Sequence, residues 1–311
     1  MTLNIERVIA KELDVRERQI TAAVELLDGG ATVPFISRYR KEITGGLDDT
    51  QLRKLEERLG YLRELEVRRE AVLSSILEQG KLTPELEIAI IAAETKVRLE
   101  DLYLPFKQKR RTKAQIALEA GIEPLADSLI SDPCLEPFDE ALAYINKDEK
   151  FKTAFEDAKG VLDGAKYILM ERFAEDAELL QSIRDFMSHN TVIFSNVVSG
   201  KEKDAAKYRD YFDLRDKFQG IPSHRALAML RGRREGVLQL RIDVVVPDDQ
   251  VHPCISMIGN HFDISHHDRA ADDWLAEVVS WTWRVKLQLH QETELMSAMR
   301  AAAEEAAIEV F

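Results

Sequence analysis

The chain has 311 residues, of which 45% are hydrophobic and 32% charged, a balance typical of a soluble, folded, helix-rich protein. No apolar run approaches the roughly 18–20 residues of a membrane-spanning helix, no signal-peptide layout opens the chain, and two cysteines make no disulfide framework, so we expect a cytoplasmic protein. The net charge of −13 argues against non-specific binding of nucleic acid by the whole surface.

The charge is unevenly distributed along the chain. Residues 1–113 hold 21 Lys and Arg against 20 Asp and Glu, a net charge of +1, whereas residues 114–311 hold 22 against 36, a net charge of −14. The first third can therefore carry a local positive face, toward which the acidic remainder would steer a phosphate backbone.

Short amphipathic helices are predicted over residues 4–13 and 16–27, and a third, basic helix begins near Thr32 and Pro34. Arg38, Arg40 and Lys41 lie on that third helix. Helix, tight glycine turn and basic helix is the outline of a helix-turn-helix. The same pattern fits an ordinary helical hairpin with solvated arginines, which is the commoner arrangement.

A long helix is predicted between Asp48 and Gly80, because leucines recur at spacings of three and four from Leu52 onward. Thr83 and Pro84 begin the next helix. After Leu99 the apolar pattern is broken at Pro105, and Thr112 can cap a following helix. The connection at residues 107–113 reads KQKRRTK. Five of its seven residues are basic: Lys107, Lys109, Arg110, Arg111 and Lys113. This loop can contact phosphates or an acidic partner, or it can simply be solvated.

Several long strings resemble the bacterial Tex family of transcription accessory proteins. They include LEDLYLPFKQKRRTKAQIALEAGIEPLA and VPFISRYRKEITGGLDDTQLRKL, with weaker matches at DGAKYILMERFAED, PSHRALAMLRGRREGVLQLRI and WLAEVVSWTWRVKL. The resemblance implies the N-terminal region of such a protein, with a helix-turn-helix-like element near its start. It also implies that an RNase-H-like domain, helix-hairpin-helix elements and an OB-fold RNA-binding domain follow in the longer protein, so we expect this chain to be truncated.

In the second half of the chain the predicted secondary structure changes from helix to strand and back to helix. Residues 138–189 have helical spacing, whereas TVIFSNVV (191–198) and VLQLRIDVVV (237–246) read as strands around a helix that begins at Ser223. From Asp268 onward the chain reads as a long helix. We predict a mainly α, irregular, multi-lobed fold with a small antiparallel β element between about 190 and 265, and three segments, 1–190, 191–265 and 266–311.

The C-terminal helix is predicted to pack on the body of the protein through one apolar face. Aromatic and aliphatic residues recur there at helical spacing: Trp274, Leu275, Val278, Trp281 and Val285. If this spacing marks the core, Trp281 is a large buried anchor.

No catalytic motif is visible, so we expect no enzyme and no cofactor. Serine-nucleophile motifs, the P-loop and the dinucleotide glycine pattern are absent. A cluster of potential metal ligands, His252, Cys254, His261, His266 and His267, has a spacing that matches no structural zinc site, and we predict packed or surface side chains rather than a metal site.

The remaining functional candidates are basic. To the two sets above the sequence adds a third, comprising His224, Arg225, Arg231, Arg233 and Arg234. Tyr39 and Tyr103 could stack on bases, but core packing is the commoner fate of tyrosine and is predicted here. The sequence indicates a non-catalytic region that binds RNA or DNA weakly and in a salt-dependent way, with transcription proteins as further partners. The alternative is a protein-docking scaffold without nucleic-acid binding of its own.

Overall fold

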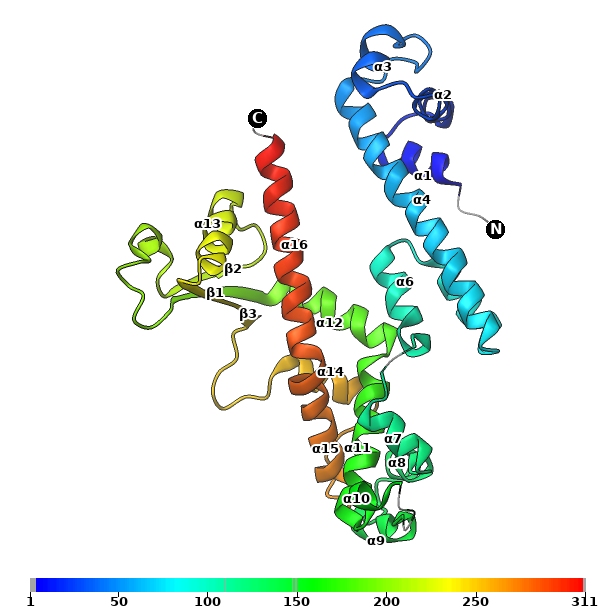
Figure 1. The fold of residues 1–311 in the computed structure, drawn as a ribbon, viewed down its shortest axis with the longest axis vertical. Helices are drawn as coiled ribbons and strands as arrows, with labels where there is room; N and C mark the ends of the chain where they lie inside the picture. Colours follow the sequence, from blue (N-terminus) through cyan, green and yellow to red (C-terminus); the bar gives the residue numbers. More distant parts are fainter. Residues whose placement is uncertain (1–3, 109, 147, 149, 310–311) are drawn as a thin grey trace. The chain divides into compact units, whose positions relative to one another are not determined.

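A computed structural model describes residues 4–108, 110–146, 148 and 150–309. The chain forms two compact units, residues 1–107 and 108–311. As predicted, the fold is mainly helical, with a small antiparallel sheet and a long C-terminal helix (Figure 1).

The first unit is built on the long helix α4, Asp49–Glu78, which confirms the predicted leucine stripe. Asp48 caps this helix by accepting a hydrogen bond from the Gln51 N–H at 2.8 Å, and the Gln51 side chain accepts from the Asp48 N–H at 3.1 Å. The stripe from Leu52 to Leu65 is buried. The other helices of the unit pack along α4: α1 Ile5–Glu12, α2 Glu17–Asp28, α3 Val33–Tyr39, α5 Pro84–Ala92 and α6 Lys96–Tyr103.

A buried arginine joins α4 to the end of α5. Arg69 is 4% exposed, and its guanidinium donates to the carbonyl oxygens of Ile90 at 3.1 Å and Ala93 at 2.6 Å while pairing with the Glu66 carboxylate. These carbonyls lie at the end of α5, where intrahelical donors run out, although the Ile90 oxygen also accepts from the Ala93 N–H at 3.3 Å. Arg69 therefore satisfies the open end of α5 from inside the unit.

The second unit has α11, Ala158–Ala174, at its helical centre (Figure 1). Helices that precede and follow α11 in the chain pack on it or on one another: α7 Lys113–Glu119, α8 Glu123–Ser131, α9 Pro137–Ala141, α10 Lys152–Phe155, α12 Ala177–Asn190, α14 Pro253–His261 and α15 Asp272–Trp281. The α11 lysine Lys166 is buried between Glu277 of α15, at 2.9 Å, and the ring of Trp281.

A three-stranded antiparallel sheet follows α12, with β1 in the centre of the order β2-β1-β3. The bounds are β1 Thr191–Val197, β2 Leu214–Lys217 and β3 Leu238–Val244, of which β1 and β3 were predicted and β2 was not. Helix α13, Ser223–Arg234, packs on β3. A Cβ atom at Gly232 would lie 2.5 Å from Leu238 Cδ1, so glycine lets the Leu238 side chain pack directly against the helix backbone.

The C-terminal helix continues from α15 through a π-helical turn, Thr282–Leu287, into α16, Gln288–Glu309. The predicted apolar face is wrong at two positions, since Trp281 is 38% and Val285 60% exposed. Trp283 is buried instead. One series of buried positions recurs every four residues, at Leu275, Val279, Trp283, Leu287, Gln291, Leu295, Met299 and Ala303, and Val278, Thr282 and Met296 beside it are buried as well. An i→i+5 turn holds more residues than an α turn, so it shifts the residues after it around the helix.

The compact units divide the chain at Lys107/Gln108, a boundary that the sequence did not indicate. The three segments 1–190, 191–265 and 266–311 stay predictions. Among the described residues, none of the helices combines the length and the apolar character needed to cross a membrane.

Candidate nucleic-acid interface

The first predicted basic set lies on an exposed surface formed by α3 and the residues after it. Val33 and Ile36 face the core of the first unit and are buried, so residues on the opposite side of this short helix face solvent. We call that side the α3 surface; it consists of Phe35, Arg38, Tyr39, Arg40 and Lys41.

Exposed aromatic rings and guanidinium groups are interleaved on the α3 surface. The rings of Phe35 and Tyr39 are 5.4 Å apart, and the Arg40 guanidinium lies 5.2 Å from the centre of the Phe35 ring. Phe35 is 40% and Tyr39 67% exposed. The prediction that Tyr39 packs in the core is therefore wrong, because the helix is short and Val33 and Ile36 alone fill its buried side.

The cations of the α3 surface have no acidic neighbours within bonding distance. In the described part of the chain, Arg38, Arg40 and Lys41 make no ion pair, whereas Arg58 and Arg63 of the same unit each bind a carboxylate at 2.7 Å. Exposed, unneutralised cations beside exposed rings suit both a phosphate backbone and stacked bases. Sequence reasoning found the three cations but missed Phe35, whose exposure depends on the packing of α3.

The predicted 107–113 loop presents less free charge than its sequence suggests. Lys107 pairs with Glu100 at 2.5 Å, Arg111 pairs with Glu119 at 2.6 Å, and the Lys113 amino group lies 3.1 Å from the Tyr167 hydroxyl. The guanidinium of Arg111 and the ammonium of Lys150 together hold the pKa of the Glu119 carboxyl below its usual range.

Two residues of this loop stand apart from the others. Arg110 is exposed and forms no ion pair within the residues that the structure describes, and Lys109 lies outside those residues. Tyr103, which precedes the loop, is half-buried, and its hydroxyl lies 2.9 Å from Ser75 Oγ. Its predicted core role thus fits better than a stacking role.

The third predicted set lies on α13 in the second unit. Arg225 pairs with Asp216 of β2 at 2.8 Å, whereas His224, Arg231, Arg233 and Arg234 are exposed. Arg110, Arg111 and Lys113 adjoin α7, which packs on α11, whereas α13 packs on α16 and β3 (Figure 1). These two basic sets therefore belong to different parts of the unit.

The histidines and cysteine of the predicted cluster have separate partners. His252 donates to Asp243 across 3.1 Å, His261 contacts Asp176 at 3.0 Å, and His267 contacts Ser265 at 2.8 Å. Burial raises the pKa of the Cys254 thiol to about 12, so this cysteine is a poor source of thiolate. Among the described residues, no three His, Cys, Asp or Glu side chains are grouped as metal ligands.

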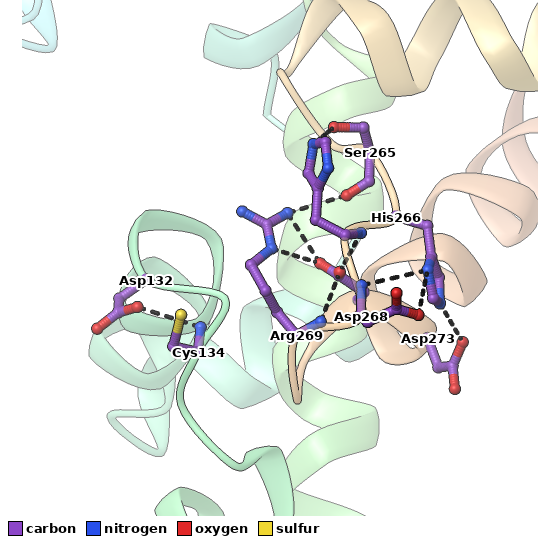
Figure 2. Close-up of polar contacts among 9 residues, drawn as sticks. Asp132, Cys134, Ser265, His266, Asp268, Arg269 and Asp273 are labelled. Carbon is purple, nitrogen blue, oxygen red and sulfur yellow. Dashed lines mark hydrogen bonds and ion pairs between the residues drawn. The ribbon is translucent and has the colours of Figure 1, made fainter.

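Figure 2 shows the loop before α15, where the Arg269 side chain reaches back to the backbone carbonyl of Ser265 and donates to it at 2.9 Å. The Asp272 carboxylate, 2% exposed, accepts from the His267 N–H at 2.6 Å, the Arg269 N–H at 3.0 Å and Arg269 Nε at 2.9 Å. The Arg269 side chain and the two backbone donors hold the pKa of Asp272 well below its usual range, against the opposing effect of burial. The second carboxylate, Asp273, contacts His266 at 3.1 Å.

Asp272→Asn is expected to lower the thermal midpoint of the chain at neutral pH. A carboxylate whose pKa is depressed by folding stabilises the protein above its unfolded pKa of about 3.9 and loses that effect as the pH falls further. The difference in midpoint between the parent and the variant should therefore be constant from pH 7 to about pH 5 and shrink below about pH 4. A calorimetric series over this range measures it, and a difference that grows in acid would contradict the assignment.

Comparison with known proteins shows to which family this chain is similar. Residues 3–77 match the Tex-like protein N-terminal domain, and residues 132–311 match the Tex central region. The chain is 56% identical over 308 residues to protein YhgF of Escherichia coli and 50% identical over 313 residues to the transcriptional accessory protein Tex of Neisseria gonorrhoeae. It is 28% identical over 264 residues to human S1 RNA-binding domain-containing protein 1.

These matches cover 98%, 99% and 82% of this chain, respectively, but only 39%, 40% and 26% of the relatives. The chain thus spans about two fifths of the length of its bacterial relatives. The two matched regions together take up most of its residues and agree with the family that the sequence motifs resemble. The chain belongs to the Tex family of transcription accessory proteins.

Proposed function

We propose that this chain is a non-catalytic, nucleic-acid-binding and interaction region of a Tex-type transcription accessory factor acting in the cytoplasm. The observation that supports this most is the α3 surface, where Arg38, Arg40 and Lys41 lie unneutralised beside two exposed rings. The names of the relatives, a transcriptional accessory protein and an S1 RNA-binding domain protein, point to the same class of partner.

The proposed binding mode is mainly electrostatic. Three cations can contact three phosphates, and Phe35 and Tyr39 can stack on unpaired bases without reading their sequence. The order of α2, a tight turn and α3 also fits a helix-turn-helix, in which α3 would enter a groove of duplex DNA. The seven-residue length of α3 favours contacts with the backbone over extended base reading.

Reversal of the three α3 charges, Arg38→Glu with Arg40→Glu and Lys41→Glu, is expected to abolish most of the binding to RNA or DNA. Three phosphate contacts give a slope of about −2 to −3 for log affinity against log salt. The parent chain should therefore lose roughly 20- to 40-fold in affinity between about 50 and 200 mM salt, and the variant should lose this dependence. Fluorescence anisotropy with labelled oligonucleotides measures both quantities.

A matched control changes the same charge elsewhere in the first unit. Arg18, Lys54 and Lys81 are exposed, have no ion pair among the described residues and lie off the α3 surface. Their combined reversal to glutamate should weaken binding much less, because only long-range repulsion changes. Equal losses in the two variants would mean that net charge, and not the α3 surface, governs binding.

A docking role for the same surface is the second candidate. It is favoured by the exposed apolar area of Phe35 and Tyr39 on this surface and by Ile43, which follows the α3 surface in the sequence and is 56% exposed. Partner proteins of the transcription machinery could cover this area. Binding that is absent with oligonucleotides at low salt, but present with a transcription protein and resistant to salt, would support docking instead.

A further inference from the structure

The three-stranded sheet of the second unit has one packed face and one open face. Directly paired residues point to the same side of a sheet, so the pairing of β1 with both neighbours defines each face. Ile193, Leu238, Leu240 and Ile242 point to the packed side and are buried beneath helices. The open face carries Val192, Phe194, Asn196, Arg215, Lys217, Gln239, Arg241 and Asp243.

A phenylalanine between two arginines occupies the centre of the open face. Phe194 of β1 is paired with Arg215 of β2 on one side and Arg241 of β3 on the other. The two guanidinium groups lie 5.0 and 4.6 Å from the centre of its ring. Phe194 is half-buried, whereas Arg215, Lys217 and Arg241 are exposed. The face therefore offers π surfaces and positive charge together.

The segment around this sheet is the positive part of an acidic chain. Residues 191–244 hold 11 Lys and Arg against 7 Asp and Glu, a net charge of +4, although the whole chain carries −13. Within the described residues, Arg215 and Lys217 form no ion pair. Asp243 is the acid on the open face; it is 6% exposed and binds His252 and Gln288 as well as Arg241.

A groove between β3 and α16 adjoins the open face. It shares Gln239 and Arg241 with that face, and Arg233 of α13 and Arg300 of α16 extend its positive charge. In the described part of the chain, neither Arg233 nor Arg300 has an ion-pair partner. The groove carboxylate Glu292 accepts a hydrogen bond from the Ile242 N–H at 3.2 Å.

We infer that the open face of this sheet and the adjoining groove bind a single strand of nucleic acid. Bases stack on Phe194 or on the guanidinium planes beside it, as aromatic and arginine side chains stack unpaired bases on other open sheets. The phosphates follow Arg241, Arg233 and Arg300 along the groove. A duplex fits this site poorly, because its bases are already stacked and paired and cannot reach the ring.

This inference rests on the proposed function for the class of ligand, but it assigns a separate site in the other unit. It accounts for Arg215 and Lys217, which lie on a strand that the sequence did not predict, and for a ring placed between two guanidinium groups on this face. An acidic protein would use the same cations, but it would have no need of a flat ring between two guanidinium groups.

The test measures binding of the 311-residue chain to a labelled single-stranded oligouridine and to a duplex of equal length, at about 50 mM salt. Phe194→Leu keeps an apolar side chain between the arginines but removes the π face, and it should weaken single-strand binding roughly tenfold. Arg233→Glu with Arg300→Glu, which reverses two of the cations that line the groove, should lower the salt slope by roughly one to two units. The matched control, Lys203→Glu with Arg209→Glu, alters exposed residues off this face and should change little.

A second measurement avoids dependence on the folding of variants. Photo-crosslinking of a 4-thiouridine oligonucleotide to the parent chain should label the peptide 185–201, which contains Phe194. Labelling confined to other peptides would overturn the inference. So would full competition by an oligoglutamate peptide at equal charge, which would assign the face to an acidic protein.

The contributions of the α3 surface and of the sheet face to binding are distinguished by repeating the titration with the chain in which the three α3 charges are reversed. Residual single-strand binding that Phe194→Leu removes supports the sheet site even if the α3 assignment fails. Complete loss of binding on α3 reversal alone overturns the sheet site and leaves the proposed function intact. Absence of binding by the parent chain contradicts both.

Discussion

Trp283→Ala is expected to destabilise the second unit by about 3–5 kcal/mol, the range found for large aromatic side chains removed from a core. Trp283 is 1% exposed, and its ring stacks on His252 with 4.7 Å between ring centres. His252 in turn binds Asp243 of β3, so the indole supports the contact between the C-terminal helix and the sheet. Chemical denaturation, with the unfolding free energy extrapolated to water, measures the loss.

Trp281→Ala is the matched comparison, since the same side chain is removed two residues away. Trp281 is 38% exposed, and the Lys166 ammonium lies 4.9 Å from its ring centre. Loss of that contact should cost about 1–2 kcal/mol. Equal costs for the two tryptophans would contradict the helical register, and a larger cost for Trp281 would restore the apolar face predicted from sequence.

Arg69→Met is expected to destabilise the first unit by about 3 kcal/mol or more, although it preserves most of the side-chain volume. The substitution removes the guanidinium donor from both carbonyls, of which Ile90 keeps the Ala93 N–H at 3.3 Å, and it removes the partner of the Glu66 carboxylate. Removing one side of a buried, hydrogen-bonded charge pair commonly costs about 3–5 kcal/mol. Thermal unfolding followed by circular dichroism measures the shift.

Arg53→Met is the control for this substitution. Arg53 lies on the same helix and pairs with Asp49 at 2.7 Å, but its side chain is 65% exposed. Exposed helical ion pairs contribute little, so the midpoint should hardly move. A small effect at Arg69 as well would show that water replaces its hydrogen bonds and that the end of α5 opens readily.

Local signals predicted the helices well because their causes are local. The capping box at Asp48 and Gln51, Thr112 before α7, and Pro84 at the start of α5 all act within one turn of the chain. The alternation in 237–246 likewise predicted β3. The strand β2 was missed because LRDK carries three charged residues and has too little apolar character to show which face is buried.

The candidate sites depend on contacts between distant segments of the chain, which the order of residues does not show. The sequence identified Arg38 and Lys107 as equivalent basic candidates, yet Lys107 is neutralised by Glu100 from an earlier helix and Arg38 has no such partner among the described residues. Which cations are paired depends on the approach of distant segments. The ring of Phe194 lies between Arg215 and Arg241 only because three strands pair in one register.

The sequence by itself determined the family, the helical class, the approximate helix limits and the existence of a small sheet, since motifs, caps and periodicity are properties of neighbouring residues. Only the tertiary structure decided which tryptophan is buried, which cations remain unpaired and which sheet face is open. These outcomes depend on helix register and on contacts between residues far apart in the chain. Trp281, the last residue of α15, is 38% exposed, whereas Trp283, two residues later in the π-helical turn, is 1% exposed.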